Sequence, residues 1–267
     1  MNLEHTAAQI RHTLCDVSSK TQTPHLGSCL SCVDILTSLY WQVLNINPTQ
    51  PKAKERDYFL LGKGHAASAL YTTLAYRGFF DITLLYEHGQ TGSRFEEHPG
   101  IFAPSGVEAV SGSLGHALSL ATGMALSSKI KNRGNHFYVL MGDGEINEGS
   151  VWEAAMFAAG KKLDNLVAII DFNKLQGTGD SCGIMHLEPL EEKWRAFGWH
   201  TLRIDGHDIN ALNSAFEVAK KQSQPVCIVA DTVKGKGVSF MENDNNWHYR
   251  IPKAEEVQLA KEELGLL

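Results

Sequence analysis

Short apolar runs alternate with longer segments in which apolar and polar positions recur at helical spacing. Apolar runs of this kind form strands buried on both faces, as in parallel sheets covered by helices. We expect strands at 57–61, 137–141, 165–171, 201–205 and 225–233. We expect helices at 30–44, 66–77, 114–131 and 148–162, with a closing helix after 253. The pattern therefore predicts an α/β fold, with three αβα layers around a mostly parallel sheet.

Two long segments break this alternation, at 86–113 and 234–253. Both are rich in glycine and carry histidine among aromatic residues. Long irregular loops in compact domains are usually functional or disordered, and this composition favours a functional role.

Composition and charge narrow the class of protein. The chain has 267 residues, is 43% hydrophobic and 20% charged, and carries a net charge of −6. This is ordinary globular composition, enough for one large domain or two small ones. No basic stripe points to nucleic acid, and no apolar run approaches the ~18 residues of a membrane span. The polar start of the chain is unlike a secretion signal, so we expect a cytoplasmic protein without membrane contact.

The five cysteines fit a reducing compartment, because their number is odd. Cys29 and Cys32 form a C-x-x-C, which a redox or metal pair would also show. No second C-x-x-C completes a zinc site, so we expect two small buried residues on a helix flank.

The strongest chemical signal is the segment GDGEINEG followed by DFNKLQ. It reads as strand, Gly-Asp-Gly, helix and strand, so Asp143 and Asn173 would follow two strands at the ligand-binding edge of the sheet. A carboxylate, an amide oxygen and a backbone carbonyl just beyond Asn173 would supply half of a Mg²⁺ shell. Gly142 and Gly144 would let the backbone approach a phosphate. A helix starting near Glu148 would turn its amino end toward the same anion.

A competing pattern lies at Gly62–Ala67, which matches the dinucleotide-binding G-x-G-x-x-A. Lys63 and His65 crowd a turn that this motif normally fills with small residues, which argues against a nicotinamide site. The chain has no P-loop motif and no G-x-S-x-G, which argues against a P-loop nucleotide site and an α/β-hydrolase.

Histidines form the second signal. Among the 12 histidines, four lie in loop contexts: His25, His65, His98 and His248. Imidazoles bind phosphate or sugar hydroxyls and move protons near neutral pH, so this set would suit a polyol phosphate.

Together these segments resemble the transketolase family, specifically its amino-terminal, diphosphate-binding part and the short subunits of two-chain enzymes. The similarity covers nearly the whole chain, so we expect one diphosphate-binding domain over 1–267. It is carried by PHLGSCLSCVDIL, FLLGKGHAASALYTTLAYRGF, HPG with GVEAVSGSLGHALSLATGMAL, GDGEINEG with DFNKLQ, and TVKGKGVSFMEN with WH. The Gly-Asp-Gly segment is general to thiamine diphosphate enzymes, whereas the histidine segments are more specific to transketolases and deoxyxylulose-phosphate synthases.

The resemblance implies thiamine diphosphate and Mg²⁺ as cofactors. The implied Mg²⁺ ligands are Asp143, Asn173 and the carbonyl of Leu175. The implied cofactor contacts are His65, Gly112, Ser113, Leu114, Gly144, Glu148, Asn173 and His248, with Glu148 at a subunit interface. The implied catalytic residues, which contact the reacting region or sugar hydroxyls, are His25, His65, His98 and His248.

The sequence departs from the family at Leu26, where the family has proline, and at His116, where it has glutamine. The glutamate that activates the cofactor lies in the family's pyrimidine-binding domain, beyond the part that this chain resembles. We therefore expect a partner chain that carries the pyrimidine-binding and C-terminal domains, in a heterotetramer.

The expected activity is transfer of a two-carbon ketol unit from a ketose phosphate to an aldose phosphate. Two alternatives stay open: a subunit of another thiamine diphosphate enzyme, such as a deoxyxylulose-phosphate-synthase-like carboligase, and a non-catalytic regulatory subunit. The sequence does not specify which sugars react.

Overall fold

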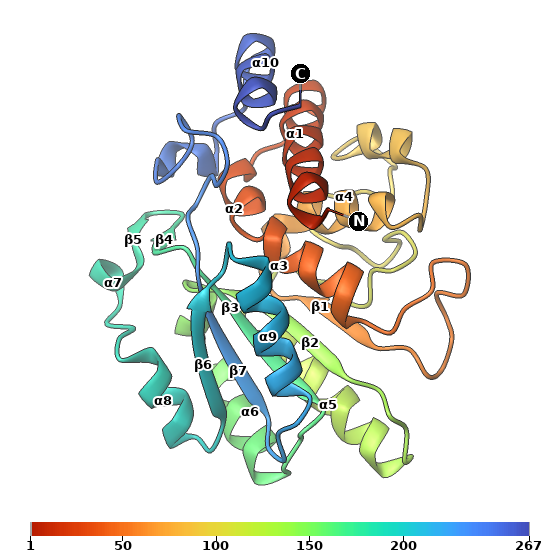
Figure 1. Cartoon of the computed structure of the whole chain (residues 1–267), viewed down its shortest axis with the longest axis vertical. Helices are drawn as coiled ribbons and strands as arrows, with labels where there is room; N and C mark the ends of the chain where they lie inside the picture. The colour runs from red at the N-terminus through yellow and green to blue at the C-terminus, as the bar shows by residue number, and fades with distance from the viewer. Residues whose placement is uncertain (1, 267) are drawn as a thin grey trace.

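A parallel five-stranded sheet forms the middle layer of the computed structural model, which describes residues 2–266 (Figure 1). Its strands run in the order β1-β2-β3-β7-β6, and every neighbouring pair is parallel. Their bounds are β1 Tyr58–Leu61, β2 Phe137–Gly142, β3 Leu166–Phe172, β6 His200–Asp205 and β7 Val226–Asp231. A two-stranded antiparallel hairpin, β4 Leu175–Gln176 with β5 Gly179–Asp180, follows β3.

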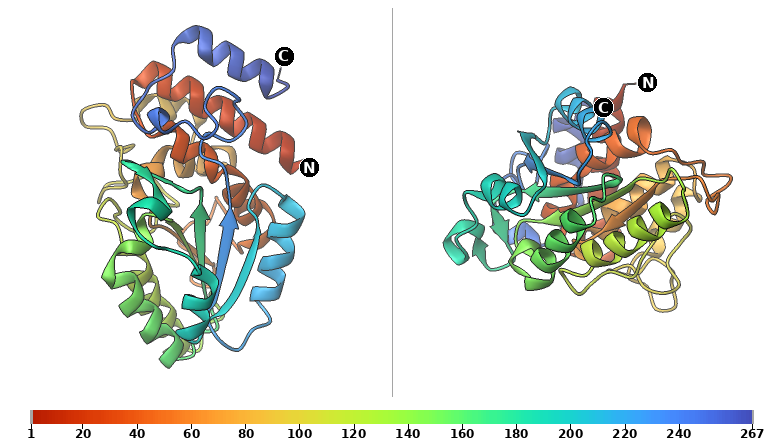
Figure 2. Two further views of the ribbon diagram at one scale, coloured as in Figure 1. Left: turned by 90° about the vertical axis from the view of Figure 1, so that its left-hand side faces the viewer. Right: turned by 90° about the horizontal axis from the view of Figure 1, so that it is seen from below.

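Helices cover both faces of the sheet, as Figure 2 shows edge-on. Alternate residues of β2 serve opposite cores, with Val139 and Met141 on one face and Tyr138 and Leu140 on the other. The first face packs against α5 Ala117–Ile130, α6 Gly149–Gly160 and α8 Leu190–Ala196. The second packs against α9 Ile209–Ala219 and the amino-terminal helices. The predicted three-layer α/β fold is confirmed.

The amino-terminal helices cover the end of the sheet toward which the strands run (Figure 2). They are α1 Leu3–Thr21, α2 Leu26–Ser31, α3 Val33–Ser38 and α4 Ala67–Tyr76, and α10 Ala254–Glu263 packs on α1. Buried Asp34 joins this layer to the sheet, because it accepts hydrogen bonds from Arg11 at 2.5 Å and from His207 Nδ1 at 2.7 Å.

The predicted strands lie within one to two residues of the observed ones, and the predicted helices at 66–77, 114–131 and 148–162 are confirmed apart from their ends. The helix expected at 30–44 is confirmed for most of its length but is not continuous. A turn at Cys32 separates α2 from α3, and α3 runs directly into the π-helix η1 Leu39–Val43. At the first break the Ser28 carbonyl receives hydrogen bonds from Lys63 Nζ at 2.9 Å and Ser31 Oγ at 3.1 Å. Side-chain bonding of this kind competes with a continuous helix.

Shorter helical segments complete the described chain. They are η2 Gly64–Ala66, η3 Ile82–Glu87, η4 Glu145–Asn147, α7 Ser181–Ile184 and η5 Asn245–His248. Of the two predicted loops, 86–113 is irregular after the end of η3, and 234–253 holds η5. No helix within residues 2–266 is both long and apolar enough to cross a membrane.

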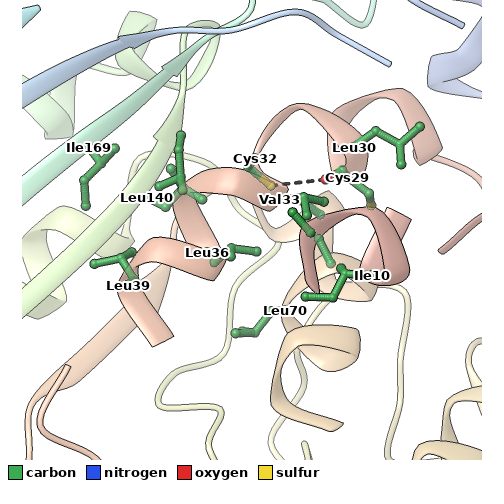
Figure 3. Close-up of a cluster of buried hydrophobic side chains, with 14 of the residues drawn as sticks. Ile10, Cys29, Leu30, Cys32, Val33, Leu36, Leu39, Leu70, Leu140 and Ile169 are labelled. Carbon is green, nitrogen blue, oxygen red and sulfur yellow. Dashed lines mark hydrogen bonds between the residues drawn. The ribbon is translucent and has the colours of Figure 1, made fainter. Parts of the chain in front are cut away.

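Cys29 and Cys32 are free, buried thiols in the hydrophobic core (Figure 3). They lie among aliphatic side chains that include Ile10, Leu36 and Leu140. Burial raises the pKa of Cys29 to about 11 and that of Cys32 to about 12. Because reactivity belongs to the thiolate, the pair is inert packing material, as the sequence predicted.

Candidate active site

Asp143 and Asn173 follow β2 and β3 directly, and these strands are paired neighbours in the sheet. The two residues therefore meet at its carboxyl edge. The Lys174 backbone N–H donates to Asp143 Oδ2 at 2.6 Å, and the Gly144 N–H donates to Oδ1 at 2.8 Å. Asn173 Oδ1 accepts from the Leu175 N–H at 3.1 Å, which curls the chain back over the strand end.

Asp143 is a buried carboxylate that forms no ion pair with another side chain in residues 2–266. Burial, with nearby Asp171 as a second cause, raises the pKa of Asp143 to about 6. A bound divalent cation would offset the free-energy cost of burying this negative charge. The described chain holds no group of three His, Cys, Asp or Glu side chains suited to a metal, so a metal ion held here would need amide or carbonyl oxygens among its ligands. Such a set fits a hard cation such as Mg²⁺.

A cavity of about 250 Å³ opens at this edge of the sheet. Its walls include predicted site residues, namely His65, His98, Gly112, Leu114, Asp143, Gly144, Asn173, Leu175 and His248. Residues that the sequence did not single out as site residues complete the wall, namely Ser28, Lys63, Glu145, Gln176 and Gly177. The volume is sufficient for part of a small organic ligand.

Four histidines from four separate segments of the chain come together here. His65, His98 and His248 line the cavity, whereas His25 lies outside its wall and packs against the other three rings. The His25 ring centroid lies 5.6 Å from that of His65, 5.8 Å from that of His98 and 5.1 Å from that of His248. Burial lowers the pKa of His25 to about 4 and that of His248 to about 3, and it holds the pKa of His65 well below the usual value. These three imidazoles are therefore neutral at physiological pH.

Backbone hydrogen bonds hold the His25 and His248 loops together. The His25 N–H donates to the His248 carbonyl at 2.9 Å, and the Gly235 N–H donates to the Gly27 carbonyl at 2.9 Å. His25 itself has φ of 74°, a left-handed conformation that is costly for a residue with a side chain and is typical of functional sites. The departure at Leu26 has a structural role, because its side chain is buried in the core.

Two predicted cofactor contacts lie outside the cavity wall. Ser113 and Glu148 are both exposed, and Glu148 caps the amino end of α6. The predicted start of this helix near Glu148 is confirmed, and the short helix η4 lies between Gly144 and α6. That the amino end of α6 faces a bound anion stays a prediction. His116 is also exposed, at the cap of α5.

Lys63, a residue of the cavity wall, forms a fully buried ion pair with Asp171. Asp171 also accepts hydrogen bonds from Ser31 Oγ at 2.6 Å and from Thr232 Oγ1. The pKa of Asp171 is lowered, because its partners outweigh the effect of burial, and that of Lys63 is raised. Sequence reasoning missed this pair, although a lysine between two glycines at a strand end was visible.

Glu145 ties three loops of the site together from its buried position. Its Oε1 accepts from the Gly115 N–H at 3.1 Å, and its Oε2 accepts from the Gly142 N–H at 3.2 Å. The carboxyl also packs closely on Gly62, since a Cβ added at Gly62 would lie only 2.5 Å from Glu145 Oε1. Burial raises the pKa of Glu145 to about 7.

Gly64 permits close approach of the 111–112 backbone. A Cβ added at Gly64 would lie 2.8 Å from the Gly112 nitrogen and 2.8 Å from the Ser111 carbonyl carbon. We expect Gly64→Ala to lower the free energy of unfolding by about 1–3 kcal/mol, since backbone must shift. The measurement is urea denaturation of the full chain. Gly123→Ala on α5 is the matched control, because nothing lies within 4 Å of its added Cβ, and it should not destabilise. Equal stability of Gly64→Ala and wild type would contradict the assigned contact.

The chain matches the family model described as transketolase, thiamine diphosphate binding domain, over residues 3–267. It belongs to this family. The expected cofactor class, thiamine diphosphate, is thereby confirmed, as is the family resemblance.

Curated relatives and solved structures agree with this assignment. The chain is 43% identical to SqwG, a subunit of the 6-deoxy-6-sulfo-D-fructose transketolase of Clostridium sp. (strain MSTE9), over 91% of this chain and 88% of that protein. It is 40% identical to a subunit of the apulose-4-phosphate transketolase of Phocaeicola vulgatus, over 98% of this chain and 94% of that protein. The expected enzyme class, transketolase, is confirmed at the level of the family.

Full-length transketolases extend well beyond the matched part. The chain is 36% identical to human transketolase, covering 97% of this chain and 42% of that protein. It superposes on the Campylobacter jejuni transketolase structure with a TM-score of 0.91 and 32% identity, covering 99% of this chain and 43% of that one.

Proposed function

We propose that the chain is the amino-terminal subunit of a two-chain transketolase, which moves a two-carbon ketol unit from a ketose phosphate to an aldose phosphate. One observation carries the proposal: a single cavity joins the buried Asp143–Asn173 edge to His65, His98 and His248, and the ring of His25 packs against all three of these histidines. The Asp143–Asn173 edge suits a metal-bridged diphosphate, and the histidine group suits a polyol.

The cofactor would lie along the carboxyl edge of the sheet. Asp143, Asn173 and the Leu175 carbonyl would hold Mg²⁺. The diphosphate would contact Gly144, Asn173, His65 and His248, with Gly112, Ser113 and Leu114 along the cofactor and Glu148 near it at the subunit interface. When bound, thiamine diphosphate supplies the electron sink that carries the two-carbon unit.

The chain's own histidines would orient the sugar and move protons. Neutral His25 lies at the centre of the histidine group, within 5.8 Å, ring to ring, of the other three. His25 and His98 would bind sugar hydroxyls, and a free ring nitrogen of His25 would accept a hydroxyl proton as the carbon–carbon bond breaks.

We propose that a partner chain supplies the pyrimidine-binding and C-terminal domains and that the assembly is a heterotetramer. An exposed apolar face supports this. α5 and α6 lie side by side on one face of the sheet (Figure 2), and both begin close to cavity residues. Leu120, Met156 and Phe157 on this face are 47%, 59% and 47% exposed. Exposed apolar patches of this kind mark protein interfaces.

A charge on this face should break the assembly. We expect Phe157→Asp to abolish co-purification of the partner, because a carboxylate buried in an apolar interface costs several kcal/mol. The measurement is the mass of the complex by light scattering. Val218→Asp on α9, 38% exposed on the opposite side of the sheet, is the control and should leave the complex intact. Full assembly with Phe157→Asp would refute the proposed interface.

A substrate panel separates this activity from its alternatives. The complex should cleave ketose phosphates in the presence of an aldose phosphate and should not turn over pyruvate. Turnover of pyruvate would favour the deoxyxylulose-phosphate-synthase-like reaction, and cofactor binding without turnover would favour a regulatory subunit. We also propose a cytoplasmic location, since all five cysteines are free and four are buried.

A further inference from the structure

The His248 ring is held on one side by a buried lysine. Lys234 is 0% exposed, and its Nζ lies 3.0 Å from His248 Nδ1. The same ammonium donates to Asn245 Oδ1 at 2.7 Å. Ser28 Oγ lies 3.4 Å from His248 Nδ1, at the edge of hydrogen-bond range.

A lysine ammonium has three donors and no acceptor. The imidazole nitrogen facing it must therefore offer a lone pair, and the ring hydrogen of a neutral histidine must then lie on the other nitrogen. Burial and Lys63 lower the pKa of Lys234 to about 8, so the charged form still predominates at neutral pH.

The opposite ring nitrogen lies on the cavity side. His248 lines the cavity, and a Cβ placed on Gly177, another wall residue, would lie 3.3 Å from His248 Nε2. Packing against neighbouring rings fixes this orientation, with centroids 5.1 Å from His25, 5.5 Å from His65 and 4.7 Å from Tyr249.

We propose that Lys234 is a positioning residue that holds His248 in the neutral tautomer with its hydrogen on Nε2. His248 then presents a hydrogen-bond donor to an oxygen of the bound ligand and is not a proton acceptor there. The tautomer follows from the chain alone, whereas the identity of the ligand rests on the proposed function. Proton acceptance falls to the other histidines of the cavity.

Nitrogen-15 NMR of the histidine-labelled full chain tests the tautomer without cofactor or activity. Two-bond proton–nitrogen correlations distinguish a protonated from an unprotonated ring nitrogen, and the signals that vanish in His248→Gln assign the residue. At neutral pH we expect His248 Nδ1 unprotonated and Nε2 protonated. A hydrogen on Nδ1 in the wild-type chain overturns the proposal, whatever the variants do.

Lys234→Met removes the donor with a side chain of similar length. We expect the His248 signals to shift to a mixture of both tautomers. In the assembled enzyme we expect affinity for thiamine diphosphate to fall roughly 10- to 100-fold, as for a lost hydrogen bond to a charged group. Lys236→Met is the control, because Lys236 is partly exposed and lies 3.5 Å from Glu242, and it should keep the wild-type tautomer. An unchanged tautomer in Lys234→Met overturns the role of the lysine.

One further spectrum separates this inference from the proposed function. With the partner chain, thiamine diphosphate and Mg²⁺ present, the His248 Nε2 proton should shift as it bonds to a ligand oxygen. A correct tautomer with no shift supports the Lys234–His248 pair and counts against the proposed cofactor site.

Discussion

Asp143→Asn is expected to abolish Mg²⁺-dependent binding of thiamine diphosphate in the assembled enzyme, with a loss of affinity greater than about 100-fold. Mutation of a residue that hydrogen-bonds a metal ligand typically lowers metal affinity 10- to 100-fold, so loss of the charged ligand itself should lower it more. The substitution preserves the shape of a buried side chain and removes the charge that no ion pair in the described chain balances. Calorimetric titration of the complex with cofactor, at fixed Mg²⁺, gives the affinity.

The control for this prediction is Asp164→Asn. Asp164 is a 42% exposed carboxylate that pairs with Lys129 and is not part of the cavity wall. The Asp164→Asn enzyme should bind thiamine diphosphate with wild-type affinity. Cofactor binding and turnover that survive Asp143→Asn would refute the metal site.

Lys63→Met is expected to lower the free energy of unfolding by about 3–5 kcal/mol. Removing one partner of a buried ion pair leaves the other charge unpaired in the interior. Asp171 is 0% exposed and would keep only hydroxyl and amide partners. Urea unfolding of the full chain measures the loss.

Two further variants test this explanation. The double variant Lys63→Met with Asp171→Asn should recover part of the loss, because no charge then remains unpaired. Lys129→Met removes the surface ion pair between Lys129 and Asp164, whose side chains are 36% and 42% exposed. It should change the free energy of unfolding by less than about 1 kcal/mol. A loss of similar size in Lys63→Met and Lys129→Met would contradict the assigned role.

The sheet was predictable because its central strands are buried on both faces. Apolar runs around Val139 and Ile169 therefore stand out from the amphipathic segments. The meeting of Asp143 and Asn173 was also predictable, since each follows a strand and the carboxyl ends of neighbouring parallel strands share one edge. The helical break near Cys32 was not predictable, because it involves a hydrogen bond from Lys63, which is distant in sequence.

The histidine group was only partly predictable. Glycine-rich contexts singled out His25 and His248, but sequence spacing alone does not show that the rings of residues so far apart in the chain pack together. The resemblance supplied that expectation. The burial of Lys63 and Lys234 was not predictable, because lysine is normally exposed and only the folded chain reveals the partners of these two side chains.

The proposed partner interface rests on an exposed apolar face that the sequence does not distinguish from core. Met156 and Phe157 are apolar residues within the predicted helix at 148–162, and the structure exposes them. Glu148, at the amino end of the same helix, is also exposed, where a partner chain would cover it.

The central claim is that this chain holds one half of a thiamine diphosphate site that a partner completes. The most direct test is purification of the tagged chain from its own cells with thiamine diphosphate and Mg²⁺, followed by mass measurement and a ketose-phosphate cleavage assay on the same sample. We predict a second chain in equal amount, with turnover that requires the cofactor. A homo-oligomer of this chain that is active alone would contradict the claim, because the activating half of the site would then lie within it.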